Sequence, residues 1–260
     1  MVKHENFKTC EQSGFCTRNR GYADSVTAKG SSWTSPYRID GNSLQAKDGR
    51  LTGVILKKVD GSSEEVRLPV VISFLESGTV RVTVDEERRQ KGDIELRHGS
   101  QVRKERYNEL SSWILVGGLN TDNSIAVNTE KDTTNVKYGP DKKYEAVIRH
   151  APFSMDFIRD DHVHIKLNGQ GLMSMEHWRP KIEREVEKTE EGEEGAQEQD
   201  VTTTQPLVDE STWWEESFGG NTDSKPKGPE SIGLDITFPG YEHVFGIPMH
   251  ASPLSLKETR

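Results

Sequence analysis

Short segments that alternate apolar and polar side chains set the strongest limit on how this chain folds. Residues 79–85, Thr-Val-Arg-Val-Thr-Val-Asp, alternate with a period of two. That period is typical of a β-strand buried on one face. Turn-forming residues recur at a spacing of about ten positions, which is the spacing of short strands in antiparallel sandwiches. The sequence therefore predicts a mainly β protein built as an antiparallel β-sandwich.

Further strands are expected wherever apolar segments of strand length lie between turn signals. They fall at 50–56, 65–68, 70–75, 114–116, 124–128, 144–150, 155–159, 162–167, 232–238 and 241–247. Only residues 86–89 and 103–110 have a locally helical pattern, and Gly, Asp and Ser interrupt both. No apolar run approaches the roughly 20 residues of a membrane-spanning helix. The N-terminus also lacks the apolar stretch of a signal peptide, so none is expected in this chain.

An acidic segment interrupts the β pattern. The chain has a formal net charge of −9, and residues 183–224 hold fourteen acidic side chains and two basic ones. The rest of the chain is close to neutral, so the net charge describes one segment, and no large basic excess is present to bind nucleic acid. Low complexity and self-repulsion predict a disordered insert over 183–212. Two interpretations stay open: an inert surface insertion and an acidic docking segment.

The two cysteines, Cys10 and Cys16, are separated by five residues that include Gly14. Two cysteines are too few for a structural zinc site. The spacing allows two free thiols, and it also allows a disulfide formed in an oxidising compartment.

Other candidate sites have a simpler alternative. His162 and His164 lie on one face of an expected strand and, with Asp160 or Asp161, could hold a metal; an exposed polar strand face is the other interpretation. Asp160 and Asp161 could form an acid/base pair or a turn that faces water. The chain contains no nucleophile elbow, phosphate loop or dinucleotide fingerprint. We therefore expect no metal, no cofactor and no self-contained active site. Basic side chains interleaved with acidic ones favour a solvated face over a phosphate site at Arg97, Arg103, Lys104 and Arg106.

Three groups of motifs are more specific. Residues 223–229 read Asp-Ser-Lys-Pro-Lys-Gly-Pro, and residues 243–248 read His-Val-Phe-Gly-Ile-Pro. The other two groups are the start of the chain at 6–16 and the stretch from Pro152-Phe153 to Glu176-His177. Together they resemble the catalytic α subunits of endoplasmic-reticulum glucosidases in glycoside hydrolase family 31. The resemblance implies a galactose-mutarotase-like N-terminal sandwich and a Cys10–Cys16 disulfide.

The same resemblance implies that the catalytic carboxylates lie elsewhere. The family carries them in a (β/α) barrel, with the nucleophile in a Trp-x-Asp-Met-Asn-Glu pattern. None of the five tryptophans here is followed by that pattern. We therefore expect no catalytic residue in this chain, which would end near Arg260, just before the barrel. The expected parts are an N-terminal segment at 1–32, the sandwich at 33–182, the insert at 183–212 and returning strands at 213–260.

A loop of the family's sandwich reaches the rim of the substrate pocket. Gly246, Ile247, Pro248 and His250 are the matching positions, and Met249 stands where the family usually has Glu. A structural junction turn and direct contact with sugar both remain open for these residues.

The implied whole enzyme is a retaining exo-α-glucosidase of the endoplasmic-reticulum lumen. It removes α-1,3-linked glucose from N-glycans, with its own barrel and a lectin-domain β subunit as partners. From another functional class, the alternative is a stand-alone sandwich that binds carbohydrate or protein.

Overall fold

A computed structural model describes residues 6–60, 63, 65–87, 118–177, 213–225, 228–246 and 253–256. The chain forms two compact units. The sheet unit consists of Lys29–Met175 and Ile232–Arg260, and the helical unit consists of Met1–Ala28 and Glu176–Ser231.

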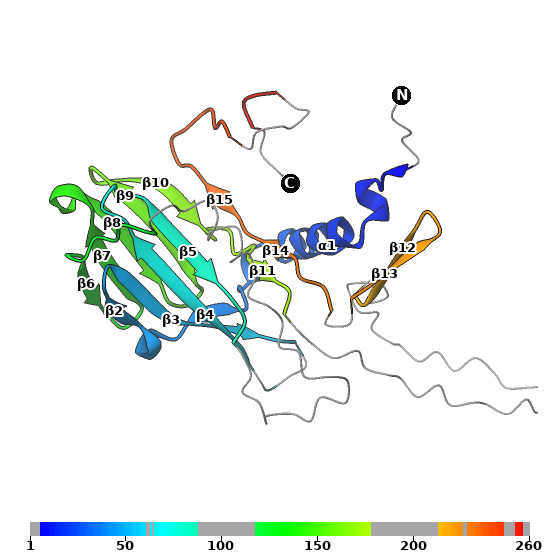
Figure 1. Ribbon diagram of the computed structural model, residues 1–260, viewed down its shortest axis with the longest axis horizontal. Helices are drawn as coiled ribbons and strands as arrows, with labels where there is room; N and C mark the ends of the chain where they lie inside the picture. Colours follow the sequence, from blue (N-terminus) through cyan, green and yellow to red (C-terminus); the bar gives the residue numbers. More distant parts are fainter. Residues whose placement is uncertain are drawn as a thin grey trace, which may run out of the picture. The chain divides into compact units, whose positions relative to one another are not determined.

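Two antiparallel sheets build the sheet unit (Figure 1). The first has the order β1-β3-β4-β5, with β2 paired to β3, and the second has the order β15-β10-β9-β8-β7-β6. The strands of the first are β1 (Tyr37–Ile39), β2 (Gln45–Lys47), β3 (Arg50–Lys58), β4 (Glu65–Phe74) and β5 (Val80–Val84). Those of the second are β6 (Ala126–Thr129), β7 (Thr133–Tyr138), β8 (Tyr144–Arg149), β9 (Ser154–Arg159), β10 (His162–Leu167) and β15 (Ile236–Thr237).

Smaller elements complete this unit. Strand β11 (Ser174–Met175) pairs with β14 (Ile232–Gly233) in a separate two-stranded sheet. The 3₁₀ turn η3 (Gly30–Ser32) precedes β1, η4 (Gly41–Ser43) lies between β1 and β2, and η5 (Pro140–Lys142) lies between β7 and β8.

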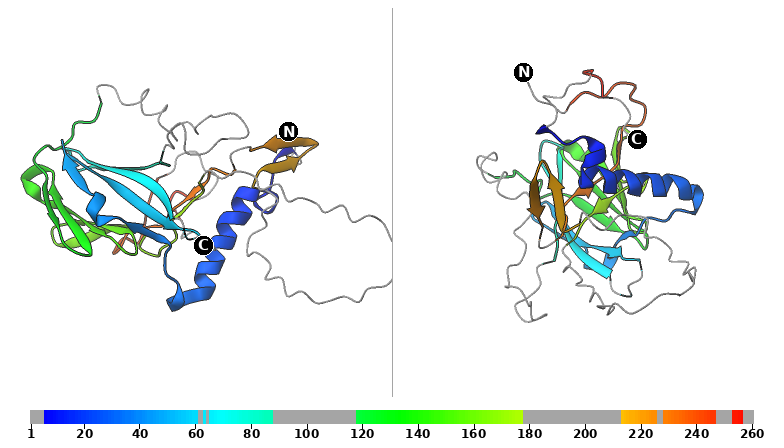
Figure 2. Two further views of the ribbon diagram at one scale, coloured as in Figure 1. Left: turned by 90° about the horizontal axis from the view of Figure 1, so that it is seen from below. Right: turned by 90° about the vertical axis from the view of Figure 1, so that its right-hand side faces the viewer.

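One hydrophobic core joins the two sheets. The first sheet supplies Leu51, Ile55, Leu68, Ile72 and Phe74, and the second supplies Val136, Ala146, Ile148 and Met155, each at most 1% exposed. The left view of Figure 2 shows the blue-to-cyan strands and the green strands as two layers. Because each strand turns alternate side chains to this core, the period of two appears in the sequence. The predicted antiparallel sandwich is confirmed.

The helical unit contains η2 (Cys10–Gln12), α1 (Gly14–Lys29) and a hairpin of β12 (Glu215–Phe218) and β13 (Asn221–Ser224). The sequence did not predict α1. Of its residues, only Gly14, Arg18 and Val26 are buried, so no apolar face repeats at the helical period. Within the described residues no helix is both long and apolar enough to cross a membrane.

Most of the expected strands are confirmed, with some corrections. The expected strand at 241–247 is wrong for its described residues 241–246, where only Phe245 pairs, in an isolated bridge with Ser255. The expected strand at 232–238 is two short strands, β14 and β15. The segments 65–68 and 70–75 are one strand, β4, which runs through Pro69; the carbonyl of Pro69 accepts the amide of Asp85 at 3.0 Å. Strand β7 went unpredicted because buried Thr134 interrupts its apolar alternation.

Several expectations lie wholly or partly outside the described residues. Of the expected helical segment 86–89, the described residues Glu86 and Glu87 have no regular structure. The segments 103–110, 114–116 and 183–212 are outside the described part of the chain. The expected domain boundaries after residues 182 and 212 also lie outside the described residues, and these two and the one after residue 32 stay predictions.

Candidate functional site

Of the four expected pocket-rim residues, only Gly246 falls within the described part of the chain. It is exposed and follows Phe245, which forms an antiparallel bridge with Ser255. The amide of Leu256 donates to the carbonyl of Val244 at 2.8 Å, so Val244 and Phe245 lie beside Ser255 and Leu256. Outside the described residues lie Ile247, Pro248, Met249 and His250. Their role at a pocket rim stays a prediction.

The segment that leads to Gly246 carries an inverted pattern. Ile232, Leu234 and Ile236 are 39%, 41% and 52% exposed, whereas the alternate residues Gly233, Asp235 and Thr237 are less exposed. A strand at a protein surface normally turns its polar residues outward. We call Ile232, Leu234 and Ile236 the apolar stripe. Neighbouring exposed apolar residues mark a surface that another protein part covers.

Asp235 occupies the inward face of this segment. Its carboxylate accepts the backbone amides of Gln170 at 2.8 Å and Leu172 at 2.9 Å. Its carbonyl oxygen accepts the amide of Asn168, also at 2.8 Å. These three bonds attach the stripe segment to the loop between β10 and β11.

Asn168 holds that loop to the core. The residue is 2% exposed and has a φ of +57°, a conformation that asparagine tolerates better than most residues. Its side-chain amide donates to the carbonyl of Phe153 at 2.6 Å and its side-chain oxygen accepts the amide of Met173 at 2.8 Å. Both side-chain bonds of Asn168 therefore end on buried backbone of the sandwich.

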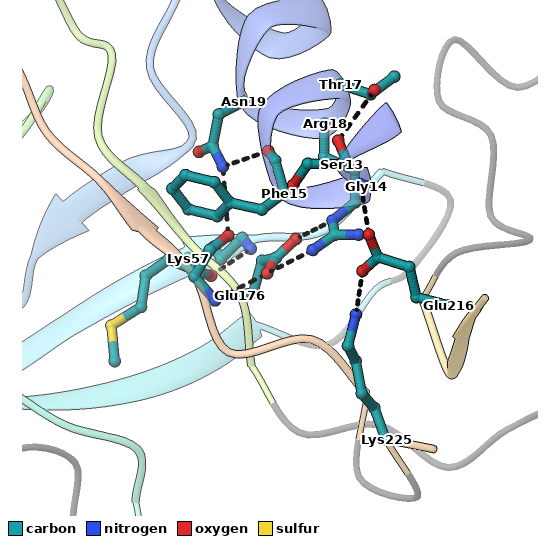
Figure 3. Close-up of polar contacts among 12 residues, drawn as sticks. Ser13, Gly14, Phe15, Thr17, Arg18, Asn19, Lys57, Glu176, Glu216 and Lys225 are labelled. Atoms are coloured by element: carbon teal, nitrogen blue, oxygen red, sulfur yellow. Dashed lines mark hydrogen bonds and ion pairs between the residues drawn. The ribbon is translucent and has the colours of Figure 1, made fainter. Parts of the chain in front are cut away.

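In the helical unit, Glu176 binds the only buried arginine among the described residues (Figure 3). Arg18 Nε donates to Glu176 Oε1 at 2.6 Å, and the amide of Ser231 donates to Oε2 at 2.8 Å. Burial alone would raise the pKa of Glu176, but the bonds from Arg18 and Ser231 outweigh burial and lower the pKa. The carboxylate is thus held in its charged form.

A second carboxylate, Glu216 on β12, holds the start of α1 (Figure 3). Its Oε1 accepts the amide of Gly14 at 3.0 Å and pairs with Lys8 at 2.9 Å, while Oε2 pairs with Lys225 at 2.8 Å. A negative charge at a helix N-terminus is favourable. The bond from Lys225 is the largest cause that lowers the pKa of Glu216, which falls from 4.5 to about 2.

The Glu216 contacts predict an acid-dependent loss of stability. A folded-state pKa below the unfolded one stabilises the fold above pH 4.5, and this stabilisation disappears as pH falls through about 2. Replacing Glu216 by Gln should therefore lower the unfolding free energy of the helical unit by about 2 kcal/mol at pH 7. The difference in unfolding free energy between the parent and the variant should shrink as the pH falls. Amide exchange in α1 between pH 7 and pH 3 measures it, and Glu11→Gln at an exposed position serves as the control.

Cys10 and Cys16 form a disulfide, with their Cα atoms 5.4 Å apart. The bond closes a loop that joins η2 to the first turn of α1. The expectation of a disulfide is confirmed, and the alternative of two free thiols is wrong.

Three other expected candidates are placed as follows. Asp160 and Asp161 form the exposed turn between β9 and β10, and both have positive φ. Asp160 pairs with the exposed side chain of Arg159. These positions fit the interpretation as a turn that faces water. His162 is exposed on β10, and His164 contacts Tyr241. Within the described residues, no three His, Cys, Asp or Glu side chains are grouped as metal ligands. The basic positions between 97 and 106 lie outside the described residues.

Sequence reasoning missed the anchoring roles of Asp235, Glu176 and Glu216. Asp235 is the polar member of an apolar–polar alternation at 232–238, so the sequence offered no sign that it faces inward. Glu176 left no signal either, since Arg18 lies 158 residues away in the sequence. Neither did Glu216, which binds Lys8 and Gly14 near the start of the chain.

Comparison with known proteins identifies the fold family. A family model described as the glycosyl hydrolase 31 N-terminal galactose mutarotase-like domain matches residues 69–260. The chain belongs to glycosyl hydrolase family 31. A crystal structure of a glucosidase II α subunit, bound to DNJ, is 56% identical in sequence with a TM-score of 0.82. That match covers 100% of this chain and 25% of the other.

Two further relatives agree with this assignment. Glucosidase 2 subunit alpha of Schizosaccharomyces pombe is 32% identical over 255 residues, covering 97% of this chain and 25% of the relative. Neutral alpha-glucosidase AB of Mus musculus is 32% identical over 276 residues, covering 99% of this chain and again 25% of the relative. The chain thus spans about a quarter of the length of the proteins it matches. The expected family and the expected similarity to glucosidase II α subunits are both confirmed.

Proposed function

We propose that this chain is the N-terminal domain of a glucosidase II-type α-glucosidase and supports a catalytic barrel located elsewhere in the polypeptide. The observation that carries the proposal is the apolar stripe, which turns Ile232, Leu234 and Ile236 to the surface just before Gly246. Phe245 and Leu254, 66% and 80% exposed, continue the apolar character beyond it. Burying such side chains against the barrel would stabilise the whole enzyme.

The substrate in this proposal is an N-glycan that carries α-1,3-linked glucose. Crystal structures of similar glucosidase II α subunits are described as Glc1Man2-bound and alpha3-Glc2-bound. A retaining glycosidase needs two carboxyl groups about 5–5.5 Å apart, one as nucleophile and one as acid/base. In our proposal the barrel supplies both, and Gly246, Ile247, Pro248 and His250 of this chain form part of the pocket rim.

Partner and compartment follow from the same similarity. A similar catalytic subunit was crystallised as a heterodimeric complex with the binding domain of a regulatory subunit. We therefore propose a β subunit as partner. The Cys10–Cys16 disulfide supports an oxidising compartment such as the endoplasmic-reticulum lumen.

Activity measurements test the assignment of the chemistry. The enzyme that contains this domain and its barrel should hydrolyse p-nitrophenyl α-glucoside and release glucose from an α-1,3-diglucoside. Residues 1–260 alone should release none. Release of glucose by the 260-residue chain would overturn the proposal, and an inactive longer protein would favour the stand-alone binding module.

The stripe provides a second, thermodynamic test. Ile236→Ser should lower the unfolding free energy of the longer enzyme by about 1–2 kcal/mol, because the side chain is buried there against the barrel. The same change in residues 1–260 should cost less, because Ile236 is 52% exposed there. Chemical denaturation of both proteins gives the comparison. Phe7→Ser is the control, since Phe7 is 62% exposed and lies outside the stripe. Equal effects of Ile236→Ser in the two proteins would contradict coverage by the barrel.

A further inference from the structure

Asp235 lies where the chain crosses between two sheets. On its N-terminal side β14 pairs with β11, through Ile232 opposite Met175 and Gly233 opposite Ser174. On its C-terminal side β15 pairs with β10, through Ile236 opposite Leu167. Two short strands of two residues each offer few ladder hydrogen bonds to fix their register.

The hydrogen bonds of Asp235 add to the few ladder bonds that hold the register of β14 and β15. Three amides of one loop, at Asn168, Gln170 and Leu172, donate to its carbonyl and its two carboxylate oxygens within 2.8–2.9 Å. An ionised carboxylate only accepts hydrogen bonds, so it can receive two amides at once without presenting a donor to either. Bonds to a charged acceptor are also stronger than neutral ones.

The loop that receives Asp235 is itself fixed. Asn168 binds the buried backbone at Phe153 and Met173. Gly171 has a φ of +72°, and a Cβ there would lie 3.2 Å from the indole nitrogen of Trp33. Asp235 is therefore tied to a rigid part of the sandwich.

The register fixed by Asp235 decides which side chains face outward. A slip of one residue in a strand moves its side chains to the opposite face. Such a slip would turn the apolar stripe inward and present Gly233, Asp235 and Thr237 to the surface. Phe245 and Gly246 follow the stripe on the same continuous segment.

We propose that Asp235 is a positioning residue for the glucosidase reaction, because it fixes the register of residues 232–237 and thereby the place of the segment that begins the pocket rim. This inference rests on the proposed function. Asp235 itself does not touch substrate in this proposal. Its effect reaches the pocket through the stripe and through residues 239–246.

Kinetics of Asp235→Asn in the enzyme that includes the barrel tests the positioning role. The new amide group would place a donor against the amide of Gln170 or Leu172, so one of the two bonds is lost. We expect KM for the α-1,3-diglucoside to rise about tenfold with a smaller change in kcat, because a shifted rim loosens substrate binding. A structural role alone would reduce the folded fraction and the apparent kcat while KM stayed unchanged, and that result would overturn the proposal.

Amide exchange in the same enzyme tests, without relying on activity, whether the hydrogen bonds of Asp235 hold the loop at 168–173. We call these hydrogen bonds the Asp235 clamp. In Asp235→Asn, peptides that cover residues 168–173 should exchange at least tenfold faster than in the parent enzyme. Asp223→Asn, at an exposed position on β13, should change neither exchange nor KM. An inactive parent enzyme would refute the proposed function, whereas unchanged exchange at 168–173 would refute the clamp. The two failures are therefore distinguishable.

Discussion

Replacing Glu176 by Gln should lower the unfolding free energy of the helical unit by about 3–5 kcal/mol, the usual cost of breaking a buried ion pair by removing one partner. Arg18 is 8% exposed and Glu176 is 12% exposed, so water cannot replace the lost charge. Gln keeps the shape and one acceptor oxygen but removes the negative charge that pairs with the guanidinium of Arg18. Amide exchange across α1 at pH 7 measures the loss directly.

The control for Glu176 is an ion pair of the same type at the surface. Glu65 pairs with Arg38 at 2.7 Å, but the two side chains are 34% and 46% exposed. Glu65→Gln should cost less than about 1 kcal/mol, because solvent screens exposed pairs. Since the pKa of Glu176 is lowered, its contribution holds above the ordinary carboxyl range and declines as pH falls below it. Equal costs for the two variants at pH 7 would show that burial of Arg18 carries no weight.

Local pattern predicted the sandwich because its strands bury one face each. In β5 every second residue is valine, and these side chains pack against the core, so the period of two is visible without knowing the partners. The turns at 139–141 and 168–169 were equally readable, since Gly and Asn accept the positive φ that the structure shows at Gly139 and Asn168.

The local sequence pattern could not predict the polar contacts between residues that are far apart in the chain. Helix α1 owes its place to Arg18, whose partner Glu176 lies 158 residues away in the sequence, and to Glu216 at its first turn. A polar helix held by such contacts has no apolar period. A family motif in the sequence pointed to Gly246. The hydrogen bonds of Asp235 could not be predicted, because its partners at 168–172 are far away in the sequence.

The hydrogen bonds of Asp235 and the apolar stripe form one arrangement within the sheet unit. A carboxylate withdrawn from water costs stability unless its oxygens are hydrogen-bonded. Asp235 is half-buried, and each of its carboxylate oxygens accepts one backbone amide, while the apolar stripe beside it stays partly exposed in this domain. An exposed stripe held by inward polar bonds is what a domain needs when its neighbour supplies the covering surface.

Asn168 is buried and holds the loop at 168–173 to the core. We expect it to be the position of that loop at which a substitution costs the most stability. Asn168→Ala should lower the unfolding free energy of the sheet unit by about 4 kcal/mol. Two buried backbone groups, at Phe153 and Met173, lose their partner, at about 1–3 kcal/mol each. Alanine also tolerates the φ of +57° less well, which adds about 1 kcal/mol. Chemical denaturation followed by circular dichroism measures the sum.

Two further variants separate the causes. Asp160 has a similar φ of +50° but sits in an exposed turn, so Asp160→Ala carries the backbone strain without the buried groups and should cost about 1 kcal/mol. Asn168→Gly removes the strain and keeps the loss of hydrogen bonds, so it should cost about 3 kcal/mol. If Asn168→Ala were as mild as Asp160→Ala, the side-chain bonds of Asn168 would not be what holds the loop. The order Ala, Gly, then the Asp160 variant, from most to least destabilised, follows only if the buried amide bonds outweigh the backbone conformation.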